Sequence, residues 1–585
     1  MGPSVSVGAK NSHSVLEDRP GAEPDLAALS ERFEWQSVLF APEPERGALL
    51  RLKAKWPLSA RRIRFHRNHG IESALSVLRP FLEYAGIEPQ FVVSDYDDSL
   101  SFSTVDPADV EVIWLDLTRF TDRLSPEGVA SWLGARVAAL RARTDAPVLV
   151  LDWDGPMAAA SEFAEQFREC TEPLGGVRLA ERRELFEDLG EYYFDEGRVS
   201  VTGTRMSRQG AVGTARLLGS RWLPALLEPR LRAVVVDLDN TLYDGVLAED
   251  GGEGVLLTEA HAELQRDLLT LRTSGLFLGL VSRNDPADVQ ELFRTRADFP
   301  LHWGDFSAHS IGWQLKSAGV ERIAQALRID TGAILFVDDN AGELLETLQR
   351  VPRLRCLHAG QDADRTVSCL RYFPGLWAFE GTVEDTLRIA DTRANEERER
   401  ALAVAADDVA SYYRELGVRL TVDHNREQRL PRIAELSRKT NQFNLALQRY
   451  GESELRSHMA AGKWELSTAR LEDRLTDSGV VAMSVAERQG SKLLVHELCI
   501  SCRALGRQLE DLIVAQMLVS GRIFAGTSEV TFPLLDGPRN QPARTWLSQL
   551  TGTSLPSAQE TVQVFVQPQR LVEASVNPHV SIAIL

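Results

Sequence analysis

The sequence has few cysteines, few aromatic residues and an excess of negative charge, and each property excludes a class of protein. Five cysteines in 585 residues are too few for a disulfide scaffold, so we expect a reduced, cytoplasmic compartment. The net charge of −19 and the aromatic content of 7% argue against a nucleic-acid partner, which needs basic surface. No apolar run is long enough for a transmembrane helix, so we expect no membrane partner. The amino terminus lacks the basic and apolar segments of a secretory signal.

The sequence is long enough for three or four domains, at roughly 100–200 residues each. Its composition, 44% hydrophobic and 25% charged, is that of a globular protein. The residue patterns divide it into five segments. These are a disordered leader at 1–25, a first α/β domain at 26–227, a second α/β domain at 228–380, a charged helical connector at 381–409 and a third, mixed α and β domain at 410–585. The sequence predicts no particular oligomeric state.

In the first domain, apolar strand candidates alternate with helical patterns. The strand candidates are Glu111–Leu117 and Ala146–Asp154, with the helical pattern GVASWLGARVAALRAR between them. Such alternation predicts a largely parallel sheet. A dense basic run covers Arg51–Arg67. It is either a docking patch for an acidic partner or, as is more common, a solvated strand or helix face.

Three strand candidates of the second domain, LRAVVVDLD, LFLGLVS and AILFVDD, end in polar side chains. The polar residues are Asp237 and Asp239, then Ser282, then Asp338 and Asp339, with Lys316 before the last strand. Because ligands of open α/β sheets bind beyond the carboxyl ends of the strands, we expect these side chains to converge on one crevice.

This set of residues is what phosphoryl transfer through a covalent aspartyl phosphate requires. Side chains alternate along a strand, so Asp237 and Asp239 lie on the same side and repel each other unless cations offset their charge. One carboxylate attacks phosphorus, and the other protonates the leaving oxygen and later activates water. A hydroxyl and Lys316 hold the phosphoryl oxygens, and acidic residues bind Mg²⁺. A loop that merely caps helices explains a lone pair of aspartates, but not this ordered set.

The order of these residues resembles the haloacid dehalogenase superfamily of phosphohydrolases. The resemblance implies that Asp237 is the nucleophile, Asp239 the general acid and base, and Lys316 the charge stabiliser. It implies a phosphate-binding set of Thr241, Ser282, Arg283 and Asn284. It also implies a metal-binding set of Asp237, Asp239, Asp338 and Asp339, with the backbone carbonyl of Asp239 as one ligand. Only about 40 residues separate Asp239 from Ser282, which leaves little room for a large lid and suits a bulky, protein-held substrate.

Further motifs resemble the FkbH-like family, which are glyceryl-transferase and phosphatase proteins of polyketide biosynthesis in subfamily IIIC of the same superfamily. The motifs are VVVDLDNTLYDGVLAEDG, VSRNDPADV, FVDDNAGEL, KTNQFNLALQRY and SCRALGRQLED. The resemblance implies that a phosphoglyceryl unit from 1,3-bisphosphoglycerate passes to a thiol, loses its phosphate and ends on the phosphopantetheine arm of an acyl carrier protein. It also implies an SGNH-like first domain, a Rossmann-like phosphatase domain and a GNAT-like third domain. We find no nucleophile motif in the first domain and interpret it as non-catalytic.

In the third domain, Cys502 is the candidate thiol, because its cationic neighbours Arg503 and Arg507 favour the thiolate. The alternative is a core cysteine, which we expect for Cys499. RALGRQ partly resembles the acetyltransferase loop whose amides bind pyrophosphate, although Gln508 stands where a small residue is expected. The expected ligands of the acyl group or the pantetheine arm are Lys439, Asn441, Gln442, Asn444, Arg503, Gly506 and Arg507. For the first four, asparagine turns at a helix C-terminus are the alternative.

The chain departs from the family pattern at Tyr243 and Asp244, where the family usually has Trp-Gly. Asp244 adds a carboxylate near the mouth of the phosphatase site, which would disfavour an anionic glycerate and change the acyl group accepted. The sequence thus predicts an Mg²⁺-dependent bifunctional enzyme that loads a phosphorylated three-carbon acid onto an acyl carrier protein and dephosphorylates it. The alternative enzyme is a phosphatase of a different small phosphorylated metabolite or carrier-bound substrate, without glyceryl transfer. The non-enzyme alternative is a scaffold that only recruits carrier proteins.

Overall fold

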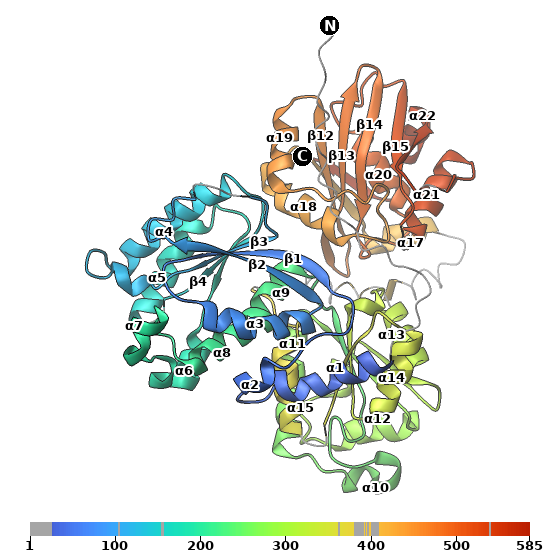
Figure 1. Cartoon of the computed structure of the whole chain (residues 1–585). Helices are drawn as coiled ribbons and strands as arrows, with labels where there is room; N and C mark the ends of the chain where they lie inside the picture. Colours follow the sequence, from blue (N-terminus) through green and yellow to red (C-terminus); the bar gives the residue numbers. More distant parts are fainter. Residues whose placement is uncertain are drawn as a thin grey trace.

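The computed structural model describes residues 26–102, 106–153, 157–360, 363–379, 391, 394, 397–398, 409–537, 540–557 and 559–585. Three sheets follow one another along the chain in Figure 1. The predicted leader and most of the predicted helical connector lie outside the described residues, and the domain boundaries stay predictions.

The first sheet consists of five parallel strands in the order β2-β1-β3-β4-β5. Its strands are β1 (Ser59–Arg67), β2 (Ile87–Tyr96), β3 (Val110–Trp114), β4 (Val148–Leu151) and β5 (Val177–Ala180). The helices of this part are α1 (Leu26–Leu39), α2 (Arg46–Leu49), α3 (Glu72–Tyr84), α4 (Pro126–Arg141), α5 (Met157–Thr171), α6 (Arg183–Leu189), α7 (Val199–Thr202), α8 (Arg208–Leu217) and α9 (Leu223–Leu227). Val148 and Val150 pack in one core cluster and Leu149 and Leu151 in another, so both faces of the sheet are covered.

The basic run contributes a strand to this sheet. Its second half is β1, which lies between β2 and β3. Arg64 and His66 are buried, and both contact Glu111 of β3, at 3.5 Å and 2.8 Å. The interpretation of the whole run as a solvated face is therefore wrong, because half of it is a central strand. A docking role remains a prediction, and it rests on exposed residues of the first half such as Arg51 and Lys53.

The second sheet also consists of five parallel strands, in the order β10-β9-β6-β7-β8. Its strands are β6 (Ala233–Val236), β7 (Phe277–Ser282), β8 (Ala308–Ile311), β9 (Ile334–Asp338) and β10 (Arg355–His358). Its helices are α10 (Leu247–Gly254), α11 (Glu259–Thr273), α12 (Pro286–Thr295), α13 (Lys316–Ala326), α14 (Ala341–Arg350) and α15 (Ala363–Tyr372). The central strand, β6, is apolar and buried along its whole length. Residues 240–276 hold α10 and α11 and no strand, so no lid domain is inserted there.

The first helix of the chain packs on this second sheet. Phe33 of α1 belongs to the core cluster that contains Phe336 of β9. The side-chain amide of Gln36 donates to the hydroxyl of Tyr84 at 2.9 Å and to the carbonyl of Cys356 at 3.4 Å. These bonds join α3 of the first part to β10 of the second, so α1 ties the two sheets together (Figure 1).

The third sheet has seven mostly antiparallel strands in the order β16-β15-β14-β13-β12-β11-β17. Its strands are β11 (Arg419–His424), β12 (Trp464–Glu472), β13 (Asp477–Gln489), β14 (Lys492–Ile500), β15 (Glu529–Leu534), β16 (Val562–Val566) and β17 (Ser581–Ile584). Its helices are α17 (Val409–Leu416), α18 (Leu430–Lys439), α19 (Glu452–Ala460), α20 (Glu510–Val519), α21 (Gln541–Thr551) and α22 (Pro568–Ala574). The three sheets confirm the predicted fold class, which is two parallel α/β sheets followed by an α+β sheet. No helix among the described residues is long and apolar enough to cross a membrane.

The strands β14 and β15 diverge after a short parallel pairing at Lys492–Leu494. Beyond it, the amide of Ile500 donates to the carbonyl of Phe443 at 3.0 Å. The amide of Leu535 donates to the carbonyl of Leu445 at 2.9 Å. Residues 443–445, within the longer motif KTNQFNLALQRY, therefore bridge the two strands where they separate.

Candidate active site

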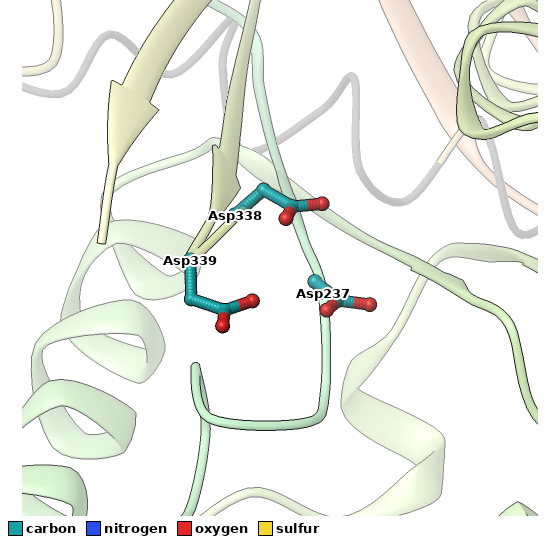
Figure 2. Close-up of side chains that lie close together, drawn as sticks. All are labelled: Asp237, Asp338 and Asp339. Atoms are coloured by element: carbon teal, nitrogen blue, oxygen red, sulfur yellow. The ribbon is translucent and has the colours of Figure 1, made fainter. Parts of the chain in front are cut away.

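The carboxyl ends of β6 and β9 bring Asp237 and Asp338 together. The two strands pair with Val236 opposite Val337, so the aspartates that follow lie at the same level. Figure 2 shows the carboxylates of Asp237, Asp338 and Asp339 side by side at this edge of the sheet. The next strand, β7, ends at this edge in the predicted hydroxyl, Ser282.

Lys316 links two of these carboxylates. It is the first residue of α13, and its ammonium lies 3.0 Å from Asp237 Oδ2 and 2.6 Å from Asp338 Oδ2. All three side chains are buried. Burial raises the pKa of Asp237, the charge of Asp338 raises it further and Lys316 lowers it. One ammonium shared by two carboxylates leaves a net negative charge in this site.

The remaining carboxylate oxygens fit a divalent cation. Asp237, Asp338 and Asp339 each offer an oxygen, and these oxygens lie within 4.8 Å of one another. Three carboxylates this close together repel one another, and a bound cation would offset that repulsion. Carboxylate oxygens are the ligands that Mg²⁺ prefers. The three carboxylates therefore fit Mg²⁺ and would hold it.

Thr241 carries an orphaned atom at this site. Its side chain is 2% exposed, and its hydroxyl oxygen has no hydrogen-bond partner. Buried hydroxyls are normally bonded, so an unpartnered one calls for an explanation. A phosphoryl oxygen, the ligand predicted for Thr241 from the sequence, would supply the missing partner.

The other predicted phosphate-binding residues contact protein groups. Arg283 lies 2.7 Å from the carboxylate of Glu343 on α14. The amide of Asn284 donates to Asp239 Oδ2 at 2.8 Å and to the hydroxyl of Ser282 at 2.9 Å. Asn284 therefore connects Ser282 to Asp239, and contact of these residues with phosphate stays a prediction.

The side chain of Asp239 lies outside the carboxylate cluster that the described residues form. Its Oδ1 accepts from the hydroxyl of Tyr243 at 2.7 Å and from the amide of Leu247 at 2.9 Å. Its Oδ2 accepts from Asn284. The predicted metal-binding role of Asp239 thus rests on its backbone carbonyl, and that role stays a prediction.

Tyr243 and Asp244, the two departures from the family pattern, differ in their exposure to solvent. Tyr243 is fully buried, and its ring lies along that of Phe299 with centroids 6.0 Å apart. Asp244 is exposed, and its backbone pairs with that of Leu256 in an isolated bridge. Only Asp244 is therefore placed to meet a substrate from solvent, and its effect on the acyl group stays a prediction. Sequence reasoning noted Tyr243 but missed its contact with Asp239, four residues earlier.

In the third domain, Cys502 is a half-buried free cysteine between β14 and α20. The guanidinium of Arg503 is buried and donates to the carbonyl of Val480 at 3.3 Å. Cys499 is fully buried in β14, and burial raises its thiol pKa, as expected of a core cysteine. The catalytic role of Cys502 stays a prediction.

Arg507 is part of a buried ion-pair network. Its guanidinium lies 2.9 Å from Asp391 and 3.5 Å from Asp473, and both aspartates also pair with Arg398. The amide of Gly506 donates to the carboxylate of Glu510, in the first turn of α20, at 2.6 Å. The amide of Gly506 and the guanidinium of Arg507, which the sequence predicts to bind the pantetheine arm, thus bond to acidic side chains of the protein.

The KTNQFN motif lies at the end of α18. Lys439 is the last residue of that helix, and its ammonium donates to Glu435 at 2.8 Å. Asn444 is fully buried, donates to the carbonyl of Thr440 at 3.2 Å and accepts from the amide of Leu447 at 2.6 Å. These contacts are those of an asparagine turn after a helix, which is the alternative to a ligand-binding role for this motif.

Two further residues of the motif are less enclosed. Asn441 is half-buried and accepts from the guanidinium of Arg449 at 2.6 Å. Gln442 is also half-buried. For all four predicted ligands in this motif, contact with an acyl group or a pantetheine arm stays a prediction.

The loop that carries Cys502 contacts the second domain just past the end of α13. This helix begins at Lys316 and has 11 residues, which span about 16 Å. Just past its far end, the guanidinium of Arg328 donates to the carbonyl of Leu505 at 2.8 Å. Leu505 lies in the loop that carries Cys502, so this loop contacts the end of α13 opposite to Lys316.

Comparisons with known proteins assign no family to this chain. No family model and no curated protein matches the sequence. The N-terminal part of a Bacteroides fragilis protein, which contains a phosphatase domain and was solved with Mg, is 15% identical with a TM-score of 0.45, over 58% of this chain and 99% of that one. A spermidine N-acetyltransferase from Vibrio cholerae in complex with CoA and spermine is 10% identical with a TM-score of 0.20, over 26% of this chain and 98% of that one. These values are too low for an argument about function, which rests on the site geometry.

Proposed function

We propose that the second domain is an Mg²⁺-dependent phosphatase that works through an aspartyl phosphate on Asp237. The observation that carries this proposal is the buried Asp237 Oδ1, which has no protein partner while Lys316 holds the other oxygen. A carboxylate nucleophile needs one such oxygen free for attack and the other fixed.

In the first half of the reaction, Asp237 Oδ1 attacks phosphorus, and the bond from phosphorus to the leaving oxygen breaks. Asp239 gives its proton to that oxygen. In the second half, water attacks phosphorus, Asp239 takes a proton from the water, and the Asp237 carboxylate is released. Lys316, Thr241 and Ser282 hold the phosphoryl oxygens. Mg²⁺, when bound, supplies positive charge that offsets that of the phosphoryl group.

We further propose that the phosphorylated substrate is a glyceryl unit from 1,3-bisphosphoglycerate, destined for an acyl carrier protein. The sequence motifs that resemble the FkbH-like family support this assignment. The thiolate of Cys502 would attack the acyl carbon of the donor and release inorganic phosphate, forming a thioester. The carrier's thiol takes the acyl group from Cys502, and the second domain then hydrolyses the phosphate ester that remains.

The placement of the two sites constrains this scheme. The Cys502 loop contacts the end of α13 opposite to Lys316, so in this scheme the acyl group has to move from one site to the other. A flexible tether solves this problem, and the phosphopantetheine arm of a carrier protein is such a tether. The first domain takes no step in the scheme.

A second candidate is a phosphatase of a different small phosphorylated metabolite or carrier-bound substrate, without glyceryl transfer. The observation that favours it is that Gly506, Arg507 and Asn444 form hydrogen bonds or ion pairs with other groups of the protein. These residues are three of the seven predicted ligands of the acyl group or the pantetheine arm.

Intact-protein mass spectrometry tests the two candidates. The enzyme is mixed with Mg²⁺, 1,3-bisphosphoglycerate made in situ and a pantetheinylated carrier protein from the same gene neighbourhood. We expect a glyceryl mass shift on the carrier, which both Asp237→Asn and Cys502→Ala abolish. A phosphoglyceryl shift with Asp237→Asn would separate acylation from dephosphorylation. No shift on any carrier, with phosphate still released from small phosphoesters, would establish the second candidate.

A further inference from the structure

Tyr243 makes a contact inside the phosphatase site that its position in the sequence does not reveal. It follows the loop of Asp239 and Asn240, and Asn240 adopts a left-handed conformation with φ of 51°. This turn brings the tyrosine hydroxyl to 2.7 Å from Asp239 Oδ1. The chain thus bonds its own buried tyrosine to the group that we assign to proton transfer.

The tyrosine ring is fixed by its surroundings. It is fully buried and lies along the ring of Phe299, at an interplanar angle of 28°. The guanidinium of Arg296 lies over the other ring of this pair, 4.5 Å from the centroid of Phe299. A ring enclosed in this way has little freedom to rotate, so its hydroxyl is a fixed donor rather than an occasional one.

Three donors from three places in the chain hold the carboxylate of Asp239. Tyr243 and the amide of Leu247 bond to Oδ1, and Asn284 bonds to Oδ2. A carboxylate two residues from Asp237 would otherwise be attracted to the positive charge of Lys316 or of a bound cation. Lys316 itself bonds to Asp237 and Asp338. The three donors therefore keep Asp239 separate from the metal-binding carboxylates.

We propose that Tyr243 is a positioning residue that aims the carboxylate of Asp239 at the leaving oxygen of the substrate. This proposal rests on the proposed function. In the first half of the reaction, Asp239 gives up its proton and becomes a carboxylate, and in the second half it takes a proton from water. The tyrosine keeps its own proton in both halves, because its hydroxyl only donates a hydrogen bond to Oδ1.

The size of the effect follows from geometry. A proton donor must lie within hydrogen-bond reach of the atom that it protonates, and a displacement of about 1 Å can cost up to about a hundredfold in rate. Substrates differ in their need for this proton. An alkyl phosphate expels a basic alkoxide and depends on it, whereas 4-nitrophenyl phosphate expels a stable phenolate and does not.

The test compares Tyr243→Phe with the wild type on 3-phosphoglycerate and on 4-nitrophenyl phosphate. The variant keeps the ring and loses only the hydroxyl. We expect kcat/KM for 3-phosphoglycerate to fall about tenfold or more. We expect kcat/KM for 4-nitrophenyl phosphate to change less than about threefold, which is well below the loss expected for 3-phosphoglycerate. In an Asp239→Asn background the same substitution should have no further effect, because the group that it positions is gone.

The matched control is Tyr84→Phe, which removes another buried tyrosine hydroxyl that bonds to Gln36 at 2.9 Å, in the first domain. It should leave both kcat/KM values unchanged. An equal fall on both substrates in Tyr243→Phe, or a fall that persists in Asp239→Asn, would overturn the inference and leave the proposed function standing. Wild-type turnover in Asp237→Asn would instead overturn the proposed function, and the inference with it.

Discussion

The ammonium of Lys316 lies 3.0 Å from the carboxylate of Asp237, at the point where α13 begins and β6 has just ended. It bonds to one oxygen of that carboxylate and leaves the other without a protein partner. The site therefore contains a buried carboxylate with one oxygen fixed and one open.

Lys316→Met should cost activity and also stability. It leaves the buried carboxylates of Asp237 and Asp338 without their shared cation. Removing one partner of a buried ion pair typically costs about 3–5 kcal/mol. Thermal denaturation in EDTA should show the loss, and Mg²⁺ should raise the melting temperature more in the variant than in the wild type. Equal melting temperatures in EDTA would show that the three groups do not interact as described.

Thr241→Val should separate activity from stability. The hydroxyl of Thr241 has no protein partner, so its loss should leave the melting temperature unchanged or raise it. Activity should fall about tenfold to a hundredfold, because a hydrogen bond to a charged phosphoryl oxygen contributes about 1.5–3 kcal/mol. The comparison is Thr347→Val, since the buried hydroxyl of Thr347 donates to the carbonyl of Glu343 at 2.7 Å. That variant should lose stability and keep its kcat/KM. A destabilised Thr241→Val with full activity would refute the assignment.

Arg507→Met tests whether this residue binds a pantetheine arm or supports the fold. Its guanidinium neutralises Asp391 and Asp473 in a buried network. We expect a loss of about 3–5 kcal/mol of stability, measured by denaturation. The exposed Arg474→Ala serves as the comparison and should melt like the wild type. A normally stable Arg507→Met protein with a raised KM for the carrier would favour the arm-binding role instead.

Glu497 should make the third domain less stable as the pH rises. Burial raises the pKa of Glu497 to about 8, although backbone amides that donate to its carboxylate lower it. The folded state therefore holds this proton at pH values where the unfolded chain has lost it. The stabilising effect is complete below the ordinary carboxyl pKa of about 4.5 and is lost as the pH rises to about 8.

The slope between those pH values should approach about 1.4 kcal/mol per pH unit. Glu497→Gln should remove this slope, because the amide does not titrate. Urea denaturation at several pH values measures it. The same slope in both proteins would show that Glu497 titrates at an ordinary pKa when folded.

The sequence predicted both parallel sheets and the convergence of Asp237, Asp338 and Lys316, because apolar strands that end in polar residues place those residues at one edge. It did not predict that β1 would bury Arg64 and His66. Their burial depends on Glu111, which lies on another strand and compensates for their charge. The sequence of the basic run alone does not reveal this contact with Glu111.

The partners of Asp239 were beyond sequence reasoning for a related reason. The contact with Tyr243 depends on the left-handed turn at Asn240, and the contact with Asn284 depends on the pairing of β6 with β7. The roles assigned to Gly506 and Arg507 came from a short motif. In the structure, both residues bond to acidic side chains that lie outside the RALGRQ motif.

The measurement that tests the central claim most directly is the detection of a phosphoryl group on Asp237. The enzyme is quenched in acid during turnover of 4-nitrophenyl phosphate with Mg²⁺, because formation of the aspartyl phosphate from this substrate does not depend on Asp239, and its peptides are analysed by mass spectrometry. We expect a phosphorylated peptide that contains Asp237, absent in Asp237→Asn, and more of it in Asp239→Asn, where hydrolysis of the aspartyl phosphate is slowed. Phosphate release at the wild-type rate by Asp237→Asn, with no phosphorylated peptide in any of the three proteins, would contradict it.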